Sequence, residues 1–353
     1  MIFDVLKNFA KLFLVITVLI TVFLYLLAIV LGPTLFYCTP EGLNASTHNF
    51  PALSVWLLNK RVSIPISFDV GVMFLFLWIV FAVSFVAAWK LRENFHRVIR
   101  ESITKPTRKI FSSCLFAMPI INSMTLIVVV AINSIQEAGG IPTGTSPIQG
   151  EPFLDFFELS YSAVVEEIGF RLIPIGVFLI IYLLITKKKE VTFSLKHKIK
   201  LFFTAFLFPD KAKRMVDAKT VSEYGVRGGI SLGEWGMVIF TSIVFGLAHF
   251  NPSVSWEIGK ISSAGVAGLV IGLSYLVYGA QAPIIMHWFF NVYIDTYSLF
   301  SGLYPTVLPF TNTIVVLALI LGILGWLAAA TLGSLNLVRA LEKKKETSGT
   351  KLR

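Results

Sequence analysis

The chain has 353 residues, of which 56% are hydrophobic and 14% are charged, and its mean hydropathy is +0.78. This composition excludes an ordinary soluble domain, because several apolar runs reach the roughly 20 residues that a membrane-spanning helix needs. The runs are continuous rather than alternating, which also disfavours a transmembrane β-barrel. The net charge of +10 comes mostly from Lys and Arg at the ends of these runs, so we expect no nucleic-acid partner.

The apolar runs define the expected domain organisation. The expected spans are 12–32, 70–89, 110–132, 151–186, 235–250, 260–279, 282–300 and 313–332. The sequence thus predicts an all-α, polytopic membrane protein with about eight transmembrane helices. We expect a single membrane domain over residues 1–353. It consists of N-terminal spans (12–150), a core that carries the polar motifs (151–300), and a last span with a basic tail (313–353).

Two segments rich in Lys and Arg set the expected orientation. Residues 90–109 and the insert 187–233 hold many of the basic residues, and basic loops face the cytoplasm in most membrane proteins. We therefore expect an integral, multi-pass protein in the lipid bilayer with both termini in the cytoplasm. Lys60 and Arg61 are the exception, because they fall in a loop that this topology places outside. Within the insert, residues 201–208 are apolar but too short to span, which indicates an interfacial helix.

The fourth expected span contains the sequence Ser162-Ala-Val-Val-Glu-Glu-Ile-Gly-Phe-Arg171. Ionisable groups within hydrocarbon cost from roughly 3 to more than 10 kcal/mol each, so they rarely occur there without a task. Glu167 and Arg171 share one helical face and favour an ion pair, which alone would serve only helix packing. Glu166 is rotated by about 100° around the helix axis from Glu167, so its side chain is free to face a group other than Arg171. The stripe that ends at Glu166 also carries Asp155, Glu158 and Ser162, which we expect to line a funnel open to water.

Two of the five histidines lie in apolar spans, each with a partner four residues away. Phe245 precedes His249 and His287 precedes Asn291, so each pair shares one face of its helix. Taken singly, such residues often only make hydrogen bonds that join helices. Together with Glu166 they are expected to converge on one pocket. Those residue types serve attack of water on a carbonyl with binding of the oxyanion, and they also accept zinc.

Two other catalytic patterns carry less weight. The His-Glu-x-x-His pattern of soluble zinc proteases is absent from the sequence. The Gly-x-Ser-x-Gly spacing of serine hydrolases occurs once, at Gly229-Ile-Ser-Leu-Gly233. It lacks the strand–turn–helix context that a nucleophilic serine requires, so we expect a flexible turn there.

The expected depths of the polar residues disagree with one another. Glu166 falls about 20 residues from the cytoplasmic end of its helix, whereas His287 falls about five residues from the same side. Convergence then requires the helices to tilt or break. Pro174 and Pro283 are the expected positions, because proline removes a backbone hydrogen bond and clashes one turn back.

The three motifs resemble those of a known protease family. Glu166-Glu167-x-x-x-Arg171, Phe245-x-x-x-His249 and His287-x-x-x-Asn291, in that order and on separate helices, look like the CPBP family. These are the CAAX-processing and bacteriocin-processing intramembrane proteases, also called the Abi or Ras-converting enzyme family. The resemblance covers about residues 151–300 and implies a CAAX-protease-like helical bundle. It also implies an endopeptidase for membrane-anchored or lipidated substrates, which in eukaryotic members are prenylated CAAX proteins that lose their last three residues.

The resemblance also implies roles for individual residues. Glu166 would be the general base that activates water, with His249 helping to position or activate it, and His287 and Asn291 would form the oxyanion site. Glu167, Arg171 and Phe245 would support them. The family has been described both as metal-dependent and as a glutamate protease. Asn291 is an uncommon metal ligand but a natural oxyanion donor, so we favour no cofactor. If zinc is bound, its ligands would be Glu166, His249 and His287.

Two other functions remain open from the sequence. A non-catalytic relative, such as an immunity or scaffolding protein, would keep the same residues for binding. A proton-coupled transporter would use buried Glu and His as a proton relay, although the chain shows no internal repeat. Rescue of a phenotype by Glu166→Ala would indicate the former, and substrate flux abolished by Glu166→Gln would indicate the latter.

Overall fold

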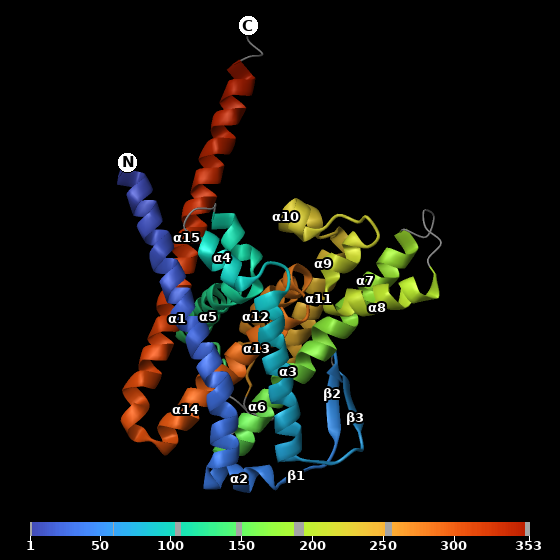
Figure 1. Ribbon diagram of the computed structural model, residues 1–353, viewed down its shortest axis with the longest axis vertical. Helices are drawn as coiled ribbons and strands as arrows, with labels where there is room; N and C mark the ends of the chain where they lie inside the picture. The colour runs from blue at the N-terminus through green and yellow to red at the C-terminus, as the bar shows by residue number, and fades with distance from the viewer. Residues whose placement is uncertain are drawn as a thin grey trace.

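The computed structural model describes residues 2–58, 60–102, 107–145, 150–186, 194–250 and 256–349. The chain is mainly helical, as expected, and its long helices form a bundle with two short antiparallel sheets at one side (Figure 1). The start of α1 and the end of α15 project from the same end of the bundle. In the first half the helices are α1 (Ile2–Cys38), α2 (Pro40–Ser46), α3 (Val70–Lys90), α4 (Phe95–Glu101), the 3-10 helix η1 (Thr107–Ser112) and α5 (Cys114–Ala138).

The second half contains the motif-bearing helices. Two of them are interrupted by a short π-helix, which we call a π-turn. The elements are α6 (Pro152–Glu167), the π-turn η2 (Ile168–Leu172), α7 (Ile173–Thr186), α8 (Leu195–Leu207), α9 (Pro209–Arg214), α10 (Val221–Gly229), α11 (Leu232–Ala248), α12 (Lys260–Tyr278), α13 (Gln281–Trp288), the π-turn η4 (Phe289–Tyr293), α14 (Ile294–Leu303), the 3-10 helix η5 (Pro305–Val307) and α15 (Leu308–Gly349).

The structure supports six or seven of the eight expected spans. Within the described residues, the stretches long and apolar enough to cross a membrane are Asn8–Cys38, Val70–Lys90, Cys114–Ala138, Pro152–Ile185, Lys260–Tyr278 and Pro305–Thr331. A seventh crossing results if α10 and α11, which are bent by 68°, form one broken span. The expected span 282–300 is helical but does not qualify. It is divided into α13, η4 and α14, and its two α-helical parts have 8 and 10 residues.

Aromatic side chains fill the centre of the bundle behind the motif helices. Tyr25 of α1 is fully buried, and its ring lies edge-on to those of Trp288 and Tyr293, with centroids 5.5 and 4.6 Å apart. Edge-to-face pairs of this kind add about 0.5–1.5 kcal/mol each to the effect of burial. The Tyr297 hydroxyl donates a hydrogen bond of 2.7 Å to the Leu24 carbonyl. These contacts fix α13, η4 and α14 against α1.

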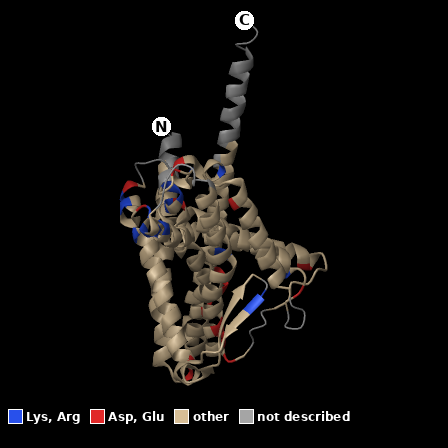
Figure 2. Cartoon of the chain, turned by 90° about the vertical axis from the view of Figure 1, so that its right-hand side faces the viewer, with Lys and Arg blue, Asp and Glu red and all other residues tan. Residues whose placement is uncertain are grey.

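The segment between α1 and α3 forms more regular structure than a loop. It contains α2 and two pairs of antiparallel strands, β1 (Asn49–Phe50) with β4 (Phe68–Asp69) and β2 (Leu53–Leu57) with β3 (Lys60–Ile64). The β2–β3 hairpin, which carries Lys60 and Arg61, lies along the motif helices (Figures 1 and 2). The Ser54 N–H donates to the Tyr161 hydroxyl of α6 at 2.8 Å, which fastens the hairpin to that helix.

The described part of the basic insert, residues 194–233, packs at one end of the bundle. Its first helix, α8, leaves Ile199, Phe202 and Phe203 exposed while Leu201 and Ala205 are buried, which agrees with the expected interfacial helix.

The serine of the Gly-x-Ser-x-Gly sequence caps α11. Its side chain accepts a hydrogen bond from the Glu234 N–H at 3.3 Å, and the Glu234 carboxylate accepts from the Ser231 N–H at 2.7 Å. These two hydrogen bonds form a capping box, so the Ser231 hydroxyl serves to cap the N-terminus of α11. The expected turn is therefore the N-terminus of a motif helix.

Candidate active site

Glu166 and Glu167 are the last residues of α6, directly before the π-turn η2. Pro174, the second residue of α7, lacks a backbone N–H, so a regular α-helical pattern cannot run through this turn. The helix departs from α geometry at residues 168–172, just before the proline that was expected to kink it. Single π-turns within helices are frequent at functional sites.

The predicted ion pair between Glu167 and Arg171 is confirmed. Arg171 Nη1 donates to Glu167 Oε1 at 2.9 Å, and both side chains are 0% exposed. The guanidinium also lies over the ring of Phe245 from α11, 4.0 Å from its centroid. Gly268 of α12 makes this arrangement possible, since a Cβ there would lie 3.0 Å from Arg171 Nη2 and 3.1 Å from Phe245 Cδ1.

His287 bridges the two carboxylates of the first motif. Its Nδ1 lies 2.7 Å from Glu167 Oε1, and its Nε2 lies 3.8 Å from Glu166 Oε2. Because a carboxylate accepts, Nδ1 carries the proton of that hydrogen bond and Nε2 faces Glu166. Glu167 therefore holds both Arg171 and His287 in place. Among the residues that the structure describes, Glu166 Oε2 has no hydrogen-bond partner.

The expected difference in depth between Glu166 and His287 disappears because α13 starts inside the molecule. All eight residues of α13 are buried. The Ala280 N–H just before it donates to the Leu207 carbonyl at 2.9 Å, so the end of α8 covers this helix start. His287 therefore reaches the level of Glu166 although it lies early in its helix.

His249 ends α11 with its ring held on three sides. Its Nδ1 lies 2.8 Å from the Phe245 carbonyl, so Nδ1 donates and Nε2 is the nitrogen left for a water molecule or substrate. The ring lies against Phe245, with centroids 4.4 Å apart, and stacks on Trp256 at 4.6 Å with an interplanar angle of 20°. Sequence reasoning missed Trp256. It follows His249 by seven positions in a loop, where no helical spacing points to it.

Asn291 lies within the π-turn η4 and is oriented by the first motif helix. Its Nδ2 donates to Ser162 Oγ at 2.9 Å, and the Ser162 hydroxyl donates to the Leu159 carbonyl at 3.0 Å. An asparagine amide has two N–H bonds, so one remains for a substrate oxygen. Ser162 lies one turn before Glu166, which brings the amide close to that carboxylate.

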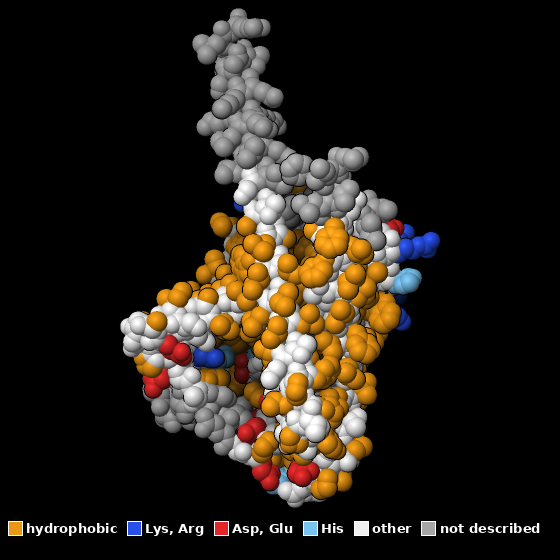
Figure 3. Space-filling model, turned by 90° about the vertical axis from the view of Figure 1, so that its left-hand side faces the viewer, with side chains coloured by type: hydrophobic (Ala, Val, Ile, Leu, Met, Phe, Trp, Pro, Cys, Tyr) orange, Lys and Arg blue, Asp and Glu red, His pale blue; other side chains and the backbone are white. Residues whose placement is uncertain are grey.

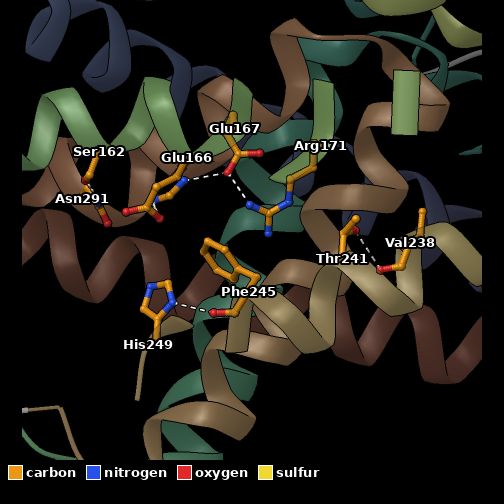
Figure 4. A network of polar contacts seen from close by, with 10 residues as sticks. Ser162, Glu166, Glu167, Arg171, Val238, Thr241, Phe245, His249 and Asn291 are labelled. Carbon is orange, nitrogen blue, oxygen red and sulfur yellow. Dashed lines mark hydrogen bonds and ion pairs between the residues drawn. The ribbon is translucent and has the colours of Figure 1, made fainter. Parts of the chain in front are cut away.

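The predicted residues thus gather from separate helices. Figure 4 shows Glu166 and Asn291 pointing toward the side on which His249 lies, with Phe245 beside His249. Phe245 links the two histidines, since its ring also meets that of His287 edge-on, with centroids 6.1 Å apart. Among the described residues, no three His, Cys, Asp or Glu side chains come close enough together to hold a metal ion. In this geometry, Glu166, His249 and His287 do not form a zinc site.

An acidic cavity lies at the other end of the stripe that leads to Glu166. It has a volume of about 650 Å³. Figure 3 shows one face of the molecule, with a hollow that contains acidic, basic and His side chains and with further acidic side chains below it. The cavity's walls combine carboxylates with apolar side chains, namely Glu41, Glu151, Asp155 and Asp295 with Phe153, Leu159, Leu299 and Leu303. Asp155 belongs to the stripe that was expected to line a funnel, and Asp295 follows Asn291 by one turn.

Comparison with known proteins supports the resemblance seen in the motifs. Residues 154–293 match the family model described as type II CAAX prenyl endopeptidase Rce1-like. The matched range contains all three motifs and covers less than half of the chain. No curated protein and no solved structure matches the chain. The match supports a protease function for an integral membrane protein with several apolar helices.

Proposed function

We propose that this chain, whose residues 154–293 form an Rce1-like domain, is an intramembrane endopeptidase for membrane-anchored substrates. The substrate class that this family description suggests is a prenylated CAAX protein. The observation that carries the proposal is the contact of His287 with both Glu166 and Glu167, because it joins two motifs that are 120 residues apart. The cytoplasmic position of both termini, which emerge at the same end of the bundle, is part of the same proposal.

Glu166 is the proposed general base. Its side chain is 16% exposed, and its buried Oε2 has no hydrogen-bond partner among the described residues. In the proposed step, water adds to the peptide carbonyl carbon and gives a proton to Glu166, which passes it to the nitrogen of the leaving amine as the C–N bond breaks. His249 Nε2 accepts a hydrogen bond from the same water and so orients it. Proton transfer by a positioned side chain contributes about 10²–10⁴-fold in rate.

Asn291 and His287 are the proposed oxyanion donors. The second N–H of Asn291 binds the negative oxygen that forms when water adds to the carbonyl. His287 joins it in the form that carries protons on both ring nitrogens, with Nδ1 still donating to Glu167. Loss of one such donor typically slows catalysis by about 10²–10³-fold. The role of Glu167 and Arg171 is to hold His287 in this orientation.

The test uses the purified full chain and a prenylated peptide that ends in a CAAX sequence. The wild type should release the last three residues, identified by mass, and Glu166→Gln should reduce kcat by at least about 100-fold with unchanged thermal stability. Glu93→Gln, outside the site, is the matched control. Equal cleavage by wild type and Glu166→Gln would disprove the assignment of the base, and no cleavage of any membrane-anchored peptide by the wild type would contradict the function.

A chelator separates the two mechanisms proposed for the family. We propose that the reaction needs no metal, so cleavage should continue after treatment with a strong zinc chelator. If the chelator abolishes cleavage and added zinc restores it, the metal-free mechanism is wrong, whereas the proposed protease function still holds.

A further inference from the structure

Lys260 is a basic residue beside the candidate active site to which the proposed mechanism gives no role. It is the first residue of α12, and its side chain is half-buried. Its Nζ lies over the ring of Trp256, 5.9 Å from the centroid, and the same ring stacks on that of His249 with centroids 4.6 Å apart. The two contacts together put the ammonium within about 10 Å of the His249 ring, which is the length of three extended residues.

The ammonium of Lys260 is available to bind an anion. Arg171 of the first motif is held by Glu167 in a fully buried ion pair. Within the described part of the chain, Lys260 Nζ makes neither an ion pair nor a hydrogen bond, and its side-chain contact is the ring of Trp256. A lysine ammonium carries three donors and no acceptor. It can therefore bind a carboxylate while it stays over the indole ring, which attracts a cation to its face.

The position of Lys260 in its helix also favours an anion nearby. The N-terminus of an α-helix carries a partial positive charge, so a lysine at this position is electrostatically unfavourable. The first turn of α12, Lys260-Ile-Ser-Ser263, contains no acidic residue to offset the two charges. A carboxylate bound to Lys260 would offset both of them, because helix N-termini also bind anions. The local sequence thus fits a site that holds an anion better than a helix start alone.

The backbone around Trp256 and Lys260 is fastened to the segment that follows α5. Trp256 forms an antiparallel bridge with Gly144, and the Gly259 N–H donates to the Pro142 carbonyl at 2.9 Å. A Cβ on Gly259 would lie 2.7 Å from that carbonyl oxygen, so the close approach requires glycine. Because this backbone is held before a ligand arrives, less conformational entropy is lost when the ligand binds.

The proposed substrate carries an anion at a matching distance from the scissile bond. Cleavage that releases three residues puts the terminal carboxylate about 10 Å from the scissile carbonyl when the fragment is extended. A carboxylate without a partner is costly at membrane depth, and pairing with a cation offsets that cost. The ammonium of Lys260 lies at the same scale of distance from His249, which is the proposed ligand of the attacking water.

We propose that Lys260 binds the terminal carboxylate of the substrate. The three residues to be released then lie between His249 and Lys260, beside the ring of Trp256. Lys260 determines which substrates bind and takes no part in proton transfer. This inference rests on the proposed function, since it assumes that the chain cleaves a peptide near its C-terminus.

The first experiment compares two prenylated CAAX peptides that differ only in a free or an amidated C-terminus. The wild type should prefer the free acid by at least about tenfold in kcat/KM, mainly through KM, which is a difference of about 1.4 kcal/mol. Lys260→Gln should lose this preference, and Lys260→Arg should keep most of it. Lys219→Gln is the matched control and should keep it fully, because Lys219 Nζ also lies over an aromatic ring, 5.8 Å from the centroid of Tyr224, but in the basic insert. A preference that survives in Lys260→Gln overturns the assignment.

The second experiment reverses the charges. A third peptide ends in an aminoethyl amide and is therefore positively charged at its C-terminus. Lys260→Glu should cleave this peptide with a higher kcat/KM than the free acid, and the opposite order overturns the inference. Each preference is a ratio measured on one protein preparation, so it does not depend on the fraction of a variant that is folded.

The wild type alone separates this inference from the proposed function. Equal kcat/KM values for the free acid and the amide overturn the role of Lys260, whichever variants fold, and leave the protease function standing. No cleavage of any of the three peptides by the wild type would contradict the protease function and the role of Lys260 with it.

Discussion

Replacing Arg171 with methionine removes a positive charge from a place that water does not reach. Arg171 and Glu167 are both 0% exposed and meet at 2.9 Å. Methionine keeps an unbranched side chain but leaves the Glu167 carboxylate with His287 as its remaining side-chain partner. Loss of one member of a buried ion pair costs about 3–5 kcal/mol, and loss of the contact over Phe245 adds about 1–2 kcal/mol. We therefore expect Arg171→Met to lower the free energy of unfolding by about 4–7 kcal/mol.

The double variant Glu167→Gln/Arg171→Met separates the ion pair from simple packing. A neutral glutamine can still accept from His287 and leaves no unpaired charge, so we expect the double variant to recover at least about 2 kcal/mol relative to Arg171→Met. Unfolding by SDS in mixed micelles, followed by circular dichroism, gives the four free energies of the cycle. A double variant as unstable as the sum of the two single variants would show that the two charges are not coupled.

Three further substitutions test other contacts. Gly169→Ala places a methyl group against the backbone of β2 and should lower both kcat and thermal stability, whereas Gly236→Ala, with no atom near its Cβ, should lower neither. Trp256→Leu removes the ring that stacks on His249 and should reduce kcat up to about tenfold, whereas Trp256→Phe should reduce it less. Equal kcat values for the wild type and both variants would contradict a positioning role for Trp256. Lys213→Met leaves the buried Glu234 carboxylate, which lies 2.7 Å from Lys213 Nζ, without its positive partner. It should lower the free energy of unfolding by about 3 kcal/mol in the same assay, whereas Lys211→Met, at an exposed position, should change it little.

Local spacing predicted the parts of this molecule that depend on a single helix. Glu167 and Arg171 form their ion pair because residues four apart meet on one helical face. Phe245 contacts His249 for the same reason. Glu166 was expected to face a different group from Glu167, but both carboxylates contact His287. Long apolar runs likewise predicted six of the spans, because membrane thickness fixes their length.

Contacts between segments that are far apart in the chain could not be predicted from the sequence. Trp256 stacks on His249 across a loop, and nothing in its neighbourhood follows a helical period. The hairpin reaches Gly169 from 111 residues earlier in the chain, since Leu58 and Gly169 are joined by one hydrogen bond. The buried start of α13 depends on α8, which belongs to the basic insert that carried no motif. Each of these contacts results from tertiary packing rather than from local preference.

The π-turn η4 explains how His287 and Asn291, although four residues apart, contact different groups. In an uninterrupted α-helix, His287 and Asn291 would point in the same direction. Because η4 begins at Phe289, between them, the wider turn rotates Asn291 away from His287. His287 then meets Glu167, while Asn291 donates to Ser162, five residues earlier on α6. In the first motif η2 also follows Glu167 directly, but there Glu167 and Arg171 still meet at 2.9 Å. The polar groups therefore surround a common space instead of forming one row. Hydrolysis of a peptide bond would require such an arrangement, because water attacks the carbonyl carbon from one side while donors bind the carbonyl oxygen on the other.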